Sequence, residues 1–142
     1  MKILMGLDYG SKTVGVAVSD ALMMTAQPLE TVTRDSEKKL RKTLARIAAL
    51  AEERGVGLFV LGRPVHMDGS AGERVEKCAA FKELLEKRTG IPVVWQDERL
   101  TTAEADEILS ESGVPKEDRK KYIDQVAASL ILQEYMDRHP EK

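Results

Sequence analysis

An aspartate at the end of the first apolar segment is the residue whose position most strongly indicates chemistry. Residues 2 to 8 are almost continuously apolar and end in Asp8. Such a strand is expected to be buried on both faces, and a carboxylate at its end is costly unless something compensates its charge. Two interpretations follow: Asp8 binds a cation, or it accepts hydrogen bonds from the turn amides of residues 10 to 12.

The elements that must position Asp8 are predicted from the periodicity of apolar residues and from Gly and Pro at element ends. The predicted strands are residues 2–8, 14–19, 28–33, 58–61 and 91–95. The predicted helices are residues 36–54, 71–89, 101–113 and 120–138. The first two strands should form a hairpin, and the third, which starts with Pro28, should lie at an edge.

This order predicts one α/β domain over residues 1–142 with a mixed five-stranded sheet. Three antiparallel strands come first and two parallel strands follow, with helices on both faces. Ligands of such sheets gather at the carboxyl ends of the parallel strands. Asp8 and Glu98 both lie at such ends. Asp97 is a reserve candidate in place of Glu98, since strand alternation would send it to the opposite side.

Composition limits the class of protein. The single cysteine, Cys78, falls in a predicted helix and is expected in the core, which fits a reducing compartment. The apolar run before Asp8 is too short for a signal peptide or a membrane span, so we expect a cytoplasmic protein. A formal net charge of −2 and 4% aromatic residues argue against a basic coat and against a base-stacking platform. Contact with a polyanion would therefore depend on phosphates and metal.

Four motifs in order carry a resemblance to a known family. They are GLDYGSKTVGVAVSD at 6–20, GRPVHMDGSAGE at 62–73, DERLTTAEA at 97–105, and Asp124 followed by VAASL at 126–130. Together they resemble the YqgF (RuvX) family of ribonuclease H-like nucleases. The resemblance covers nearly the whole chain and implies a ribonuclease H-like fold.

The resemblance also implies a metal site. By position, Asp8, Glu98 and Asp124 match the acids that are thought to bind Mg²⁺ or Mn²⁺ in these nucleases. Hydrolysis of a phosphodiester needs an activated water and stabilisation of negative charge, and two such ions about 4 Å apart supply both. The alternatives are ion pairs: Glu98 with Arg99 or Lys12, and Asp124 with Lys120. Small residues at 127 and 128 favour close approach of the last helix to the sheet.

One departure concerns the related resolvases of the RuvC type. They resemble this fold but carry an acid at the end of the fourth strand, where this sequence has Gly62, Arg63 and Pro64. The metal geometry must therefore differ, which bears on junction resolution more than on phosphodiester cleavage.

Several polar residues are candidates for contact with nucleic acid. They are Lys12, Arg63, Ser70, Arg99 and Lys120. The loop at 67–72 leads into a helix start whose free amides can hold a phosphate, although an ordinary N-cap at Ser70 explains the same residues. The basic run at 116–121 is either a solvated face or a guide for a nucleic-acid backbone.

The resemblance implies a metal-dependent nuclease that matures the 5′ end of the precursor of 16S ribosomal RNA. A Holliday-junction resolvase-like DNA nuclease and a nucleic-acid-binding module without turnover are the alternatives. A sugar-kinase or actin-type ATPase also has a D-x-G-S loop, but 142 residues leave no room for its second domain.

Overall fold

The computed structural model describes residues 3–10, 12–22, 24–36, 39–64, 72–98 and 101–139. The strands are β1 (Ile3–Tyr9), β2 (Thr13–Ser19), β3 (Ala26–Thr33), β4 (Val56–Pro64) and β5 (Val93–Glu98). The helices are α1 (Arg41–Arg54), α2 (Gly72–Thr89), α3 (Thr101–Glu111) and α4 (Lys116–Arg138). None of the helices in these ranges is long and apolar enough to cross a membrane.

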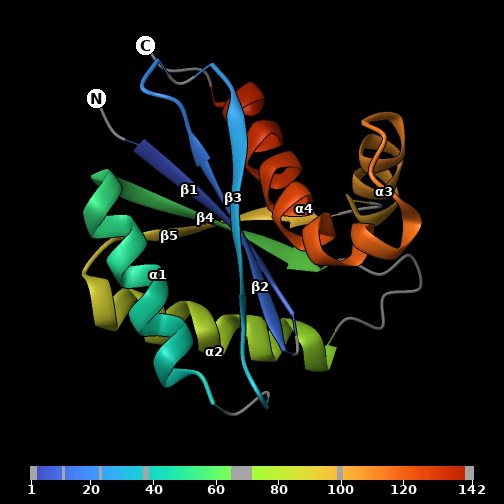
Figure 1. Cartoon of the computed structure of the whole chain (residues 1–142). Coiled ribbons are helices and arrows are strands. Elements are labelled where there is room, and N and C mark those ends of the chain that lie inside the picture. Colours follow the sequence, from blue (N-terminus) through green and yellow to red (C-terminus); the bar gives the residue numbers. More distant parts are fainter. Residues whose placement is uncertain are drawn as a thin grey trace.

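The strands form one mixed sheet in the order β3-β2-β1-β4-β5 (Figure 1). β1 pairs antiparallel with β2, and β2 pairs antiparallel with β3. β4 then pairs parallel with β1 on its other side, and β5 pairs parallel with β4. The predicted hairpin, the edge position of the third strand and the two parallel strands are thus confirmed.

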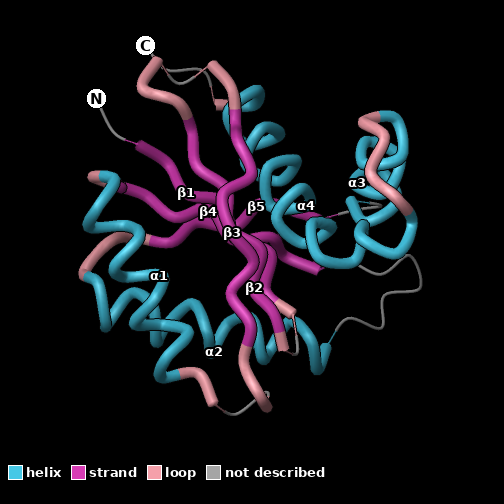
Figure 2. The backbone as a smooth tube through the Cα atoms, in the orientation of Figure 1, coloured by secondary structure: helices cyan, strands magenta, loops and turns pink. Residues whose placement is uncertain are grey.

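Helices cover both faces of this sheet (Figure 2), as predicted. Side chains on one face, such as Leu7 and Phe59, belong to the core cluster that includes α1 and α2. Side chains on the other face, such as Leu4 and Val60, pack with α4. α3 lies outside this layer and packs against α4. Cys78 belongs to the first cluster and is 1% exposed, which confirms it as a core residue.

The elements differ from the prediction mainly at their ends. β3 begins at Ala26, and Pro28 lies inside it beside a shift in register. β5 runs from Val93 to Glu98 and therefore includes the acids that were expected to follow it. α1 begins at Arg41, five residues later than predicted, directly after its N-cap, Leu40.

The prediction is also wrong for the start of α4, which begins at Lys116 directly after its N-cap, Pro115. A proline fixes φ near −65° and is well suited to a helix start. The predicted helix ends at Gly55 and Gly90 are confirmed, since both glycines have positive φ, 68° and 71°.

Candidate active site at the carboxyl end of the central strand

Two glycines allow the backbone of α4 to lie directly against the sheet. A Cβ added at Gly6 would lie 2.7 Å from the carbonyl oxygen of Ala128 and 2.7 Å from Cβ of Leu132. A Cβ added at Gly15 would overlap the backbone carbonyl of Asp124. Any larger residue at either position would push the helix outward.

Gly15 also connects Asp8 with Asp124. Asp8 pairs with Gly15 across β1 and β2, and directly opposite residues of paired strands project to the same face. Because the free side of Gly15 faces α4, Asp8 projects toward α4 as well. The first strand and the last helix therefore bring Asp8 and Asp124 to one place at the end of β1. Asp8 is 8% exposed and Asp124 is half-buried.

The small residues at 127 and 128 were both predicted to allow the close approach of α4 to the sheet, and one of them does so. Ala128 is fully buried in the cluster between α4 and the sheet, as its small size suggested. Ala127 instead packs toward α3, together with Ala105 and Leu109. The prediction is thus confirmed for Ala128 and wrong for Ala127.

Strand alternation sets the direction of the two acids in β5. Val60 of β4 pairs with Val94, and both pack in the cluster under α4. Two residues further along, Gln96 lies on that same face, and the same alternation is the basis for the prediction that Glu98 belongs to it. The backbone of Glu98 pairs with Pro64, while its side chain lies outside the described part of the structure.

Asp97 has a different environment. It lies on the face opposite Gln96 and pairs with Arg63 across the strands, with 3.7 Å between Oδ1 and Nη1. Among the described side chains, which exclude that of Glu98, no group of three His, Cys, Asp or Glu residues could hold a metal. Asp8 and Asp124 are thus the two predicted ligands whose side chains are described.

Two arginines hold the chain directly after Asp8. Arg34 donates a hydrogen bond of 2.6 Å to the carbonyl oxygen of Gly10, and its guanidinium lies 4.9 Å from the ring centre of Tyr9. Arg74 donates to the carbonyl oxygen of Tyr9 at 3.3 Å. The Tyr9 ring stacks on Phe81 with 4.6 Å between the centroids.

Both arginines were absent from the sequence prediction. They are 24 and 65 residues from the carbonyls that they contact, and no local motif marks such a distant contact. They fix the path of the backbone at the point where β1 ends.

The residues predicted to contact nucleic acid are placed unevenly. Arg63 and Lys12 are exposed, Arg63 at the end of β4 and Lys12 in the turn between β1 and β2. Lys120 belongs to the first turns of α4, but its side chain is not described. Ser70 and Arg99 lie outside the described residues.

The fold is that of known Holliday-junction resolvases. RuvC of Thermus thermophilus, solved in complex with a Holliday junction substrate, matches with a TM-score of 0.59 at 16% identity, over 100% of this chain and 99% of that one. The Holliday junction resolvase of fowlpox virus matches with a TM-score of 0.52 at 17% identity, over 96% of this chain and 98% of that one. These likenesses confirm the ribonuclease H-like fold.

The sequence narrows the class further. The family model RuvX, described as Holliday junction resolvase, matches residues 2–138. A Lachnospira eligens protein named "Putative pre-16S rRNA nuclease" is 54% identical over 94% of this chain and 96% of its own length. A Lactococcus lactis protein with the same name is 49% identical over 98% of this chain and 96% of its own. The chain belongs to the RuvX family, which confirms the predicted family and the predicted enzyme class, a nuclease.

Proposed function

We propose that this chain is a nuclease that hydrolyses phosphodiester bonds with divalent metal, Mg²⁺ or Mn²⁺, and that it processes the 5′ end of pre-16S ribosomal RNA in the cytoplasm. One observation carries the proposal. Asp8 and Asp124, from opposite ends of the chain, lie on one face at the end of the central strand because Gly15 leaves room for α4.

The two carboxylates suit a hard cation. Mg²⁺ and Mn²⁺ prefer oxygen ligands, and a bound cation would offset the cost of the buried charge of Asp8. Glu98, two residues beyond Gln96 on the same face of β5, would be the third ligand. When bound, the metal would supply an activated water and stabilise the negative charge that develops on the phosphate.

The protein itself fixes the position of the Asp8 carboxylate. Asp8 lies at the end of a strand that is paired on both sides, so its backbone has little freedom. The hydrogen bonds from Arg34 and Arg74 fix the two carbonyls that follow it. A carboxylate held in this way is oriented before substrate binds, which reduces the reorganisation needed during the reaction.

RNA is the proposed substrate because the relatives that share about half of the sequence are named for pre-16S rRNA. The family description instead names the Holliday junction. β4 ends in Gly62, Arg63 and Pro64, without an acid, whereas the resemblance to resolvases of the RuvC type implies that those carry an acid at the end of this strand. A ligand set that lacks this acid supports cleavage of a substrate other than a four-way junction.

The test is a cleavage assay on three substrates: a structured RNA with a 5′ extension, linear DNA and a four-way junction, each with Mg²⁺, Mn²⁺ or EDTA. We expect cleavage of the RNA with metal and none with EDTA. Asp8→Asn and Asp124→Asn should each lower the rate more than about a thousandfold, because the ligands act as one unit.

Asp97→Asn is the matched control, since it makes the same chemical change on the opposite face of β5. It should cleave at nearly the wild-type rate. Full activity in EDTA would exclude the metal mechanism. Activity in Glu98→Gln together with inactivity in Asp97→Asn would show that the third ligand is Asp97. Binding without cleavage of any substrate would favour the non-catalytic module.

Thermal melts test the same site without a substrate. Close carboxylates repel one another, so Asp8→Asn should leave the melting temperature in EDTA unchanged or raise it. A hundredfold excess of Mg²⁺ over its dissociation constant should stabilise the wild type by about 2.7 kcal/mol and the variant much less. An aspartate that only accepts hydrogen bonds would give the reverse: a lower melting temperature for the variant and no effect of metal.

A further inference from the structure

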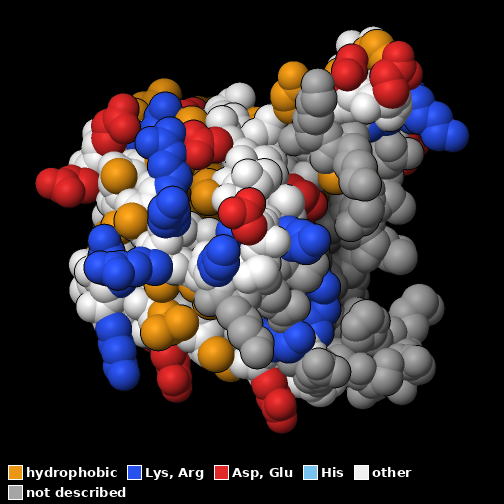
Figure 3. Space-filling view, turned by 60° about the horizontal axis from the view of Figure 1, so that its bottom comes forward, with side chains coloured by type: hydrophobic (Ala, Val, Ile, Leu, Met, Phe, Trp, Pro, Cys, Tyr) orange, Lys and Arg blue, Asp and Glu red, His pale blue; other side chains and the backbone are white. Residues whose placement is uncertain are grey.

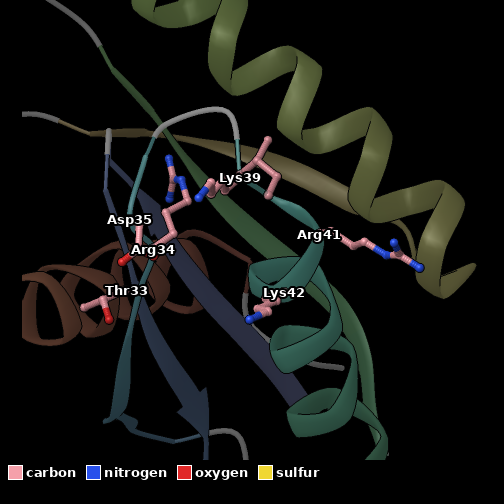
Figure 4. Close-up of a pocket in the computed structure, with 7 residues that line it drawn as sticks. Thr33, Arg34, Asp35, Lys39, Arg41 and Lys42 are labelled. Atoms are coloured by element: carbon pink, nitrogen blue, oxygen red, sulfur yellow. The ribbon is translucent and has the colours of Figure 1, made fainter.

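A basic pocket lies where β3 ends and α1 begins (Figure 4). Its volume is about 500 Å³. The lining residues are Thr33, Arg34, Asp35, Lys39, Leu40, Arg41 and Lys42. None of these residues was predicted to take part in function.

The lining is strongly unbalanced in charge, with four cations and one carboxylate, in a chain of net charge −2. Lys39, Arg41 and Lys42 are exposed, and none of them forms an ion pair with a carboxylate in the described part of the chain. Arg34 is 8% exposed, and Figure 4 shows the end of the Lys39 side chain beside the Arg34 side chain. Four cations beside a single carboxylate, that of Asp35, favour the binding of an anion.

The charges in the first turn of α1 also favour the binding of an anion. Its first turn contains Arg41 and Lys42 and no acid. Acids are the residues that stabilise the first turn of a helix, whereas cations there are unfavourable. These two cations therefore destabilise α1, and an anion bound beside them would offset this destabilisation.

The pocket lies close to the proposed active site. Thr33 pairs with Thr13 of β2, two residues before Gly15, which pairs with Asp8. Strand spacings of about 4.8 Å and a rise of about 3.3 Å per residue put Thr33 and Asp8 roughly 12 Å apart. Arg34 connects the two regions directly, because it also donates to Gly10 in the turn after Asp8.

The two sites lie on opposite sides of an edge of the sheet. Asp8 faces α4, whereas Val32 and Arg34 lie on the side of α1 and Tyr9. β3 is the edge strand, so nothing in the sheet lies beyond it. Figure 3, which brings this end of the molecule forward, shows Lys and Arg side chains spread across the middle of the face.

We propose that this pocket binds the phosphodiester backbone of nucleic acid a few nucleotides from the bond that is cut. The proposal rests on the nuclease function proposed above. Exposed lysines and arginines bind phosphates without reading bases, which suits a contact that orients the substrate strand rather than selecting its sequence. The strand would pass around the turn between β1 and β2 to reach Asp8.

The test compares two double variants of equal charge change. Lys39→Ala with Lys42→Ala empties the pocket of two exposed cations and leaves the buried Arg34 in place. Lys87→Ala with Arg88→Ala removes two exposed cations from the last turn of α2, near the other end of the sheet. Binding of a labelled RNA of about 30 nucleotides is measured in EDTA, so that nothing is cut, at about 50 to 200 mM salt.

The pocket variant should bind about tenfold more weakly, and the slope of log affinity against log salt should fall by about 1 to 2, since each lost phosphate contact removes about 0.7 to 0.9. The control should stay within about twofold of the wild type with the same slope. Melting temperatures check that both variants fold. Equal affinity and slope in the pocket variant and the wild type would overturn the proposal, and so would an equal loss in the control.

Failure of the pocket and failure of the proposed function remain distinguishable. A wild type that cleaves RNA, with a pocket variant that binds normally, overturns the pocket alone. A wild type that binds RNA through Lys39 and Lys42 but never cleaves it supports the pocket and overturns the nuclease.

Discussion

The sheet is covered in different ways on its two faces. On the face of α1 and α2, large side chains fill the space between the layers, and the largest fully buried ones include Phe59, Phe81 and Leu7. On the face of α4, helix backbone lies against strand backbone at Gly6 and Gly15, and larger side chains such as Leu4, Val60 and Leu132 pack around these contacts. Asp8 and Asp124 belong to this second face.

The two faces contribute differently: the face of α1 and α2 contributes folding stability, and the face of α4 fixes the position of the two carboxylates. A buried Phe or Leu contributes about 1.5 to 3 kcal/mol wherever it packs well, and such a core tolerates small shifts of its layers. Two carboxylates that share a metal do not tolerate such shifts, because a displacement of about 1 Å can cost a hundredfold in rate. Direct backbone contact leaves α4 few alternative positions.

The first prediction weakens the bulky face. Phe59→Ala removes a fully buried ring from the α1 and α2 side of β4, at a distance from Asp8 along the paired strand. The free energy of unfolding should fall by about 3 to 5 kcal/mol, measured by urea titration. The cleavage rate of the protein that remains folded should match the wild type. A loss of rate larger than the unfolded fraction would show that the two faces are not separable.

The second prediction disturbs the close-packed face. Gly15→Ala places a Cβ against the backbone of Asp124, so α4 must move outward. We expect a loss of about 1 to 3 kcal/mol in stability and at least about a hundredfold in cleavage, with much weaker stabilisation by Mg²⁺. The rate should therefore fall more than for Phe59→Ala although the protein loses less stability.

Gly72→Ala is the matched control for stability. A Cβ at Gly72 meets nothing within 4 Å, and this glycine begins α2 with no positive φ. Replacement should leave the protein as stable as before or more stable by up to about 1 kcal/mol. If Gly15→Ala behaved in the same way, the contact between α4 and β2 would be looser than described.

Much of the fold could be predicted because its signals are local. The apolar runs that form β1 and β4, the stripe of α1 and the helix ends at Gly55 and Gly90 all depend on neighbouring residues. The start of α1 could not be predicted, since the polar residues before Arg41 are compatible with either a helix or a loop. Only tertiary contacts decide between them.

The features of the candidate site also fall into two groups: those that local sequence predicts and those that depend on tertiary packing. The direction of Asp8 follows from alternation along a strand, and the same alternation predicts opposite directions for Glu98 and Asp97. The contact between Gly15 and Asp124 depends on the packing of distant segments, so only the small Ala128 hinted at it. The basic pocket does have a sequence signal, a cluster of Lys and Arg at a helix start where acids are usual.

The smallest predicted effect concerns an ion pair that joins α1 to β3 on the bulky face. Arg46 donates two hydrogen bonds to Glu30, of 2.6 and 2.8 Å, and these bonds lower the pKa of the Glu30 carboxyl. A carboxyl whose pKa is lower in the folded state stabilises the protein above its unfolded pKa, and this contribution disappears as pH falls through the folded pKa. Glu30→Gln should therefore lower the melting temperature at neutral pH by about 2 °C or less, since partly exposed pairs contribute little. Once the pH is low enough to protonate Glu30 in the folded state, the difference from the wild type should vanish. Glu52→Gln, on the exposed side of the same helix, is the matched control and should leave the melting temperature at neutral pH unchanged. A difference that persists in acid would mean that Glu30 acts through packing rather than through its charge, and that this face is held by apolar contact alone.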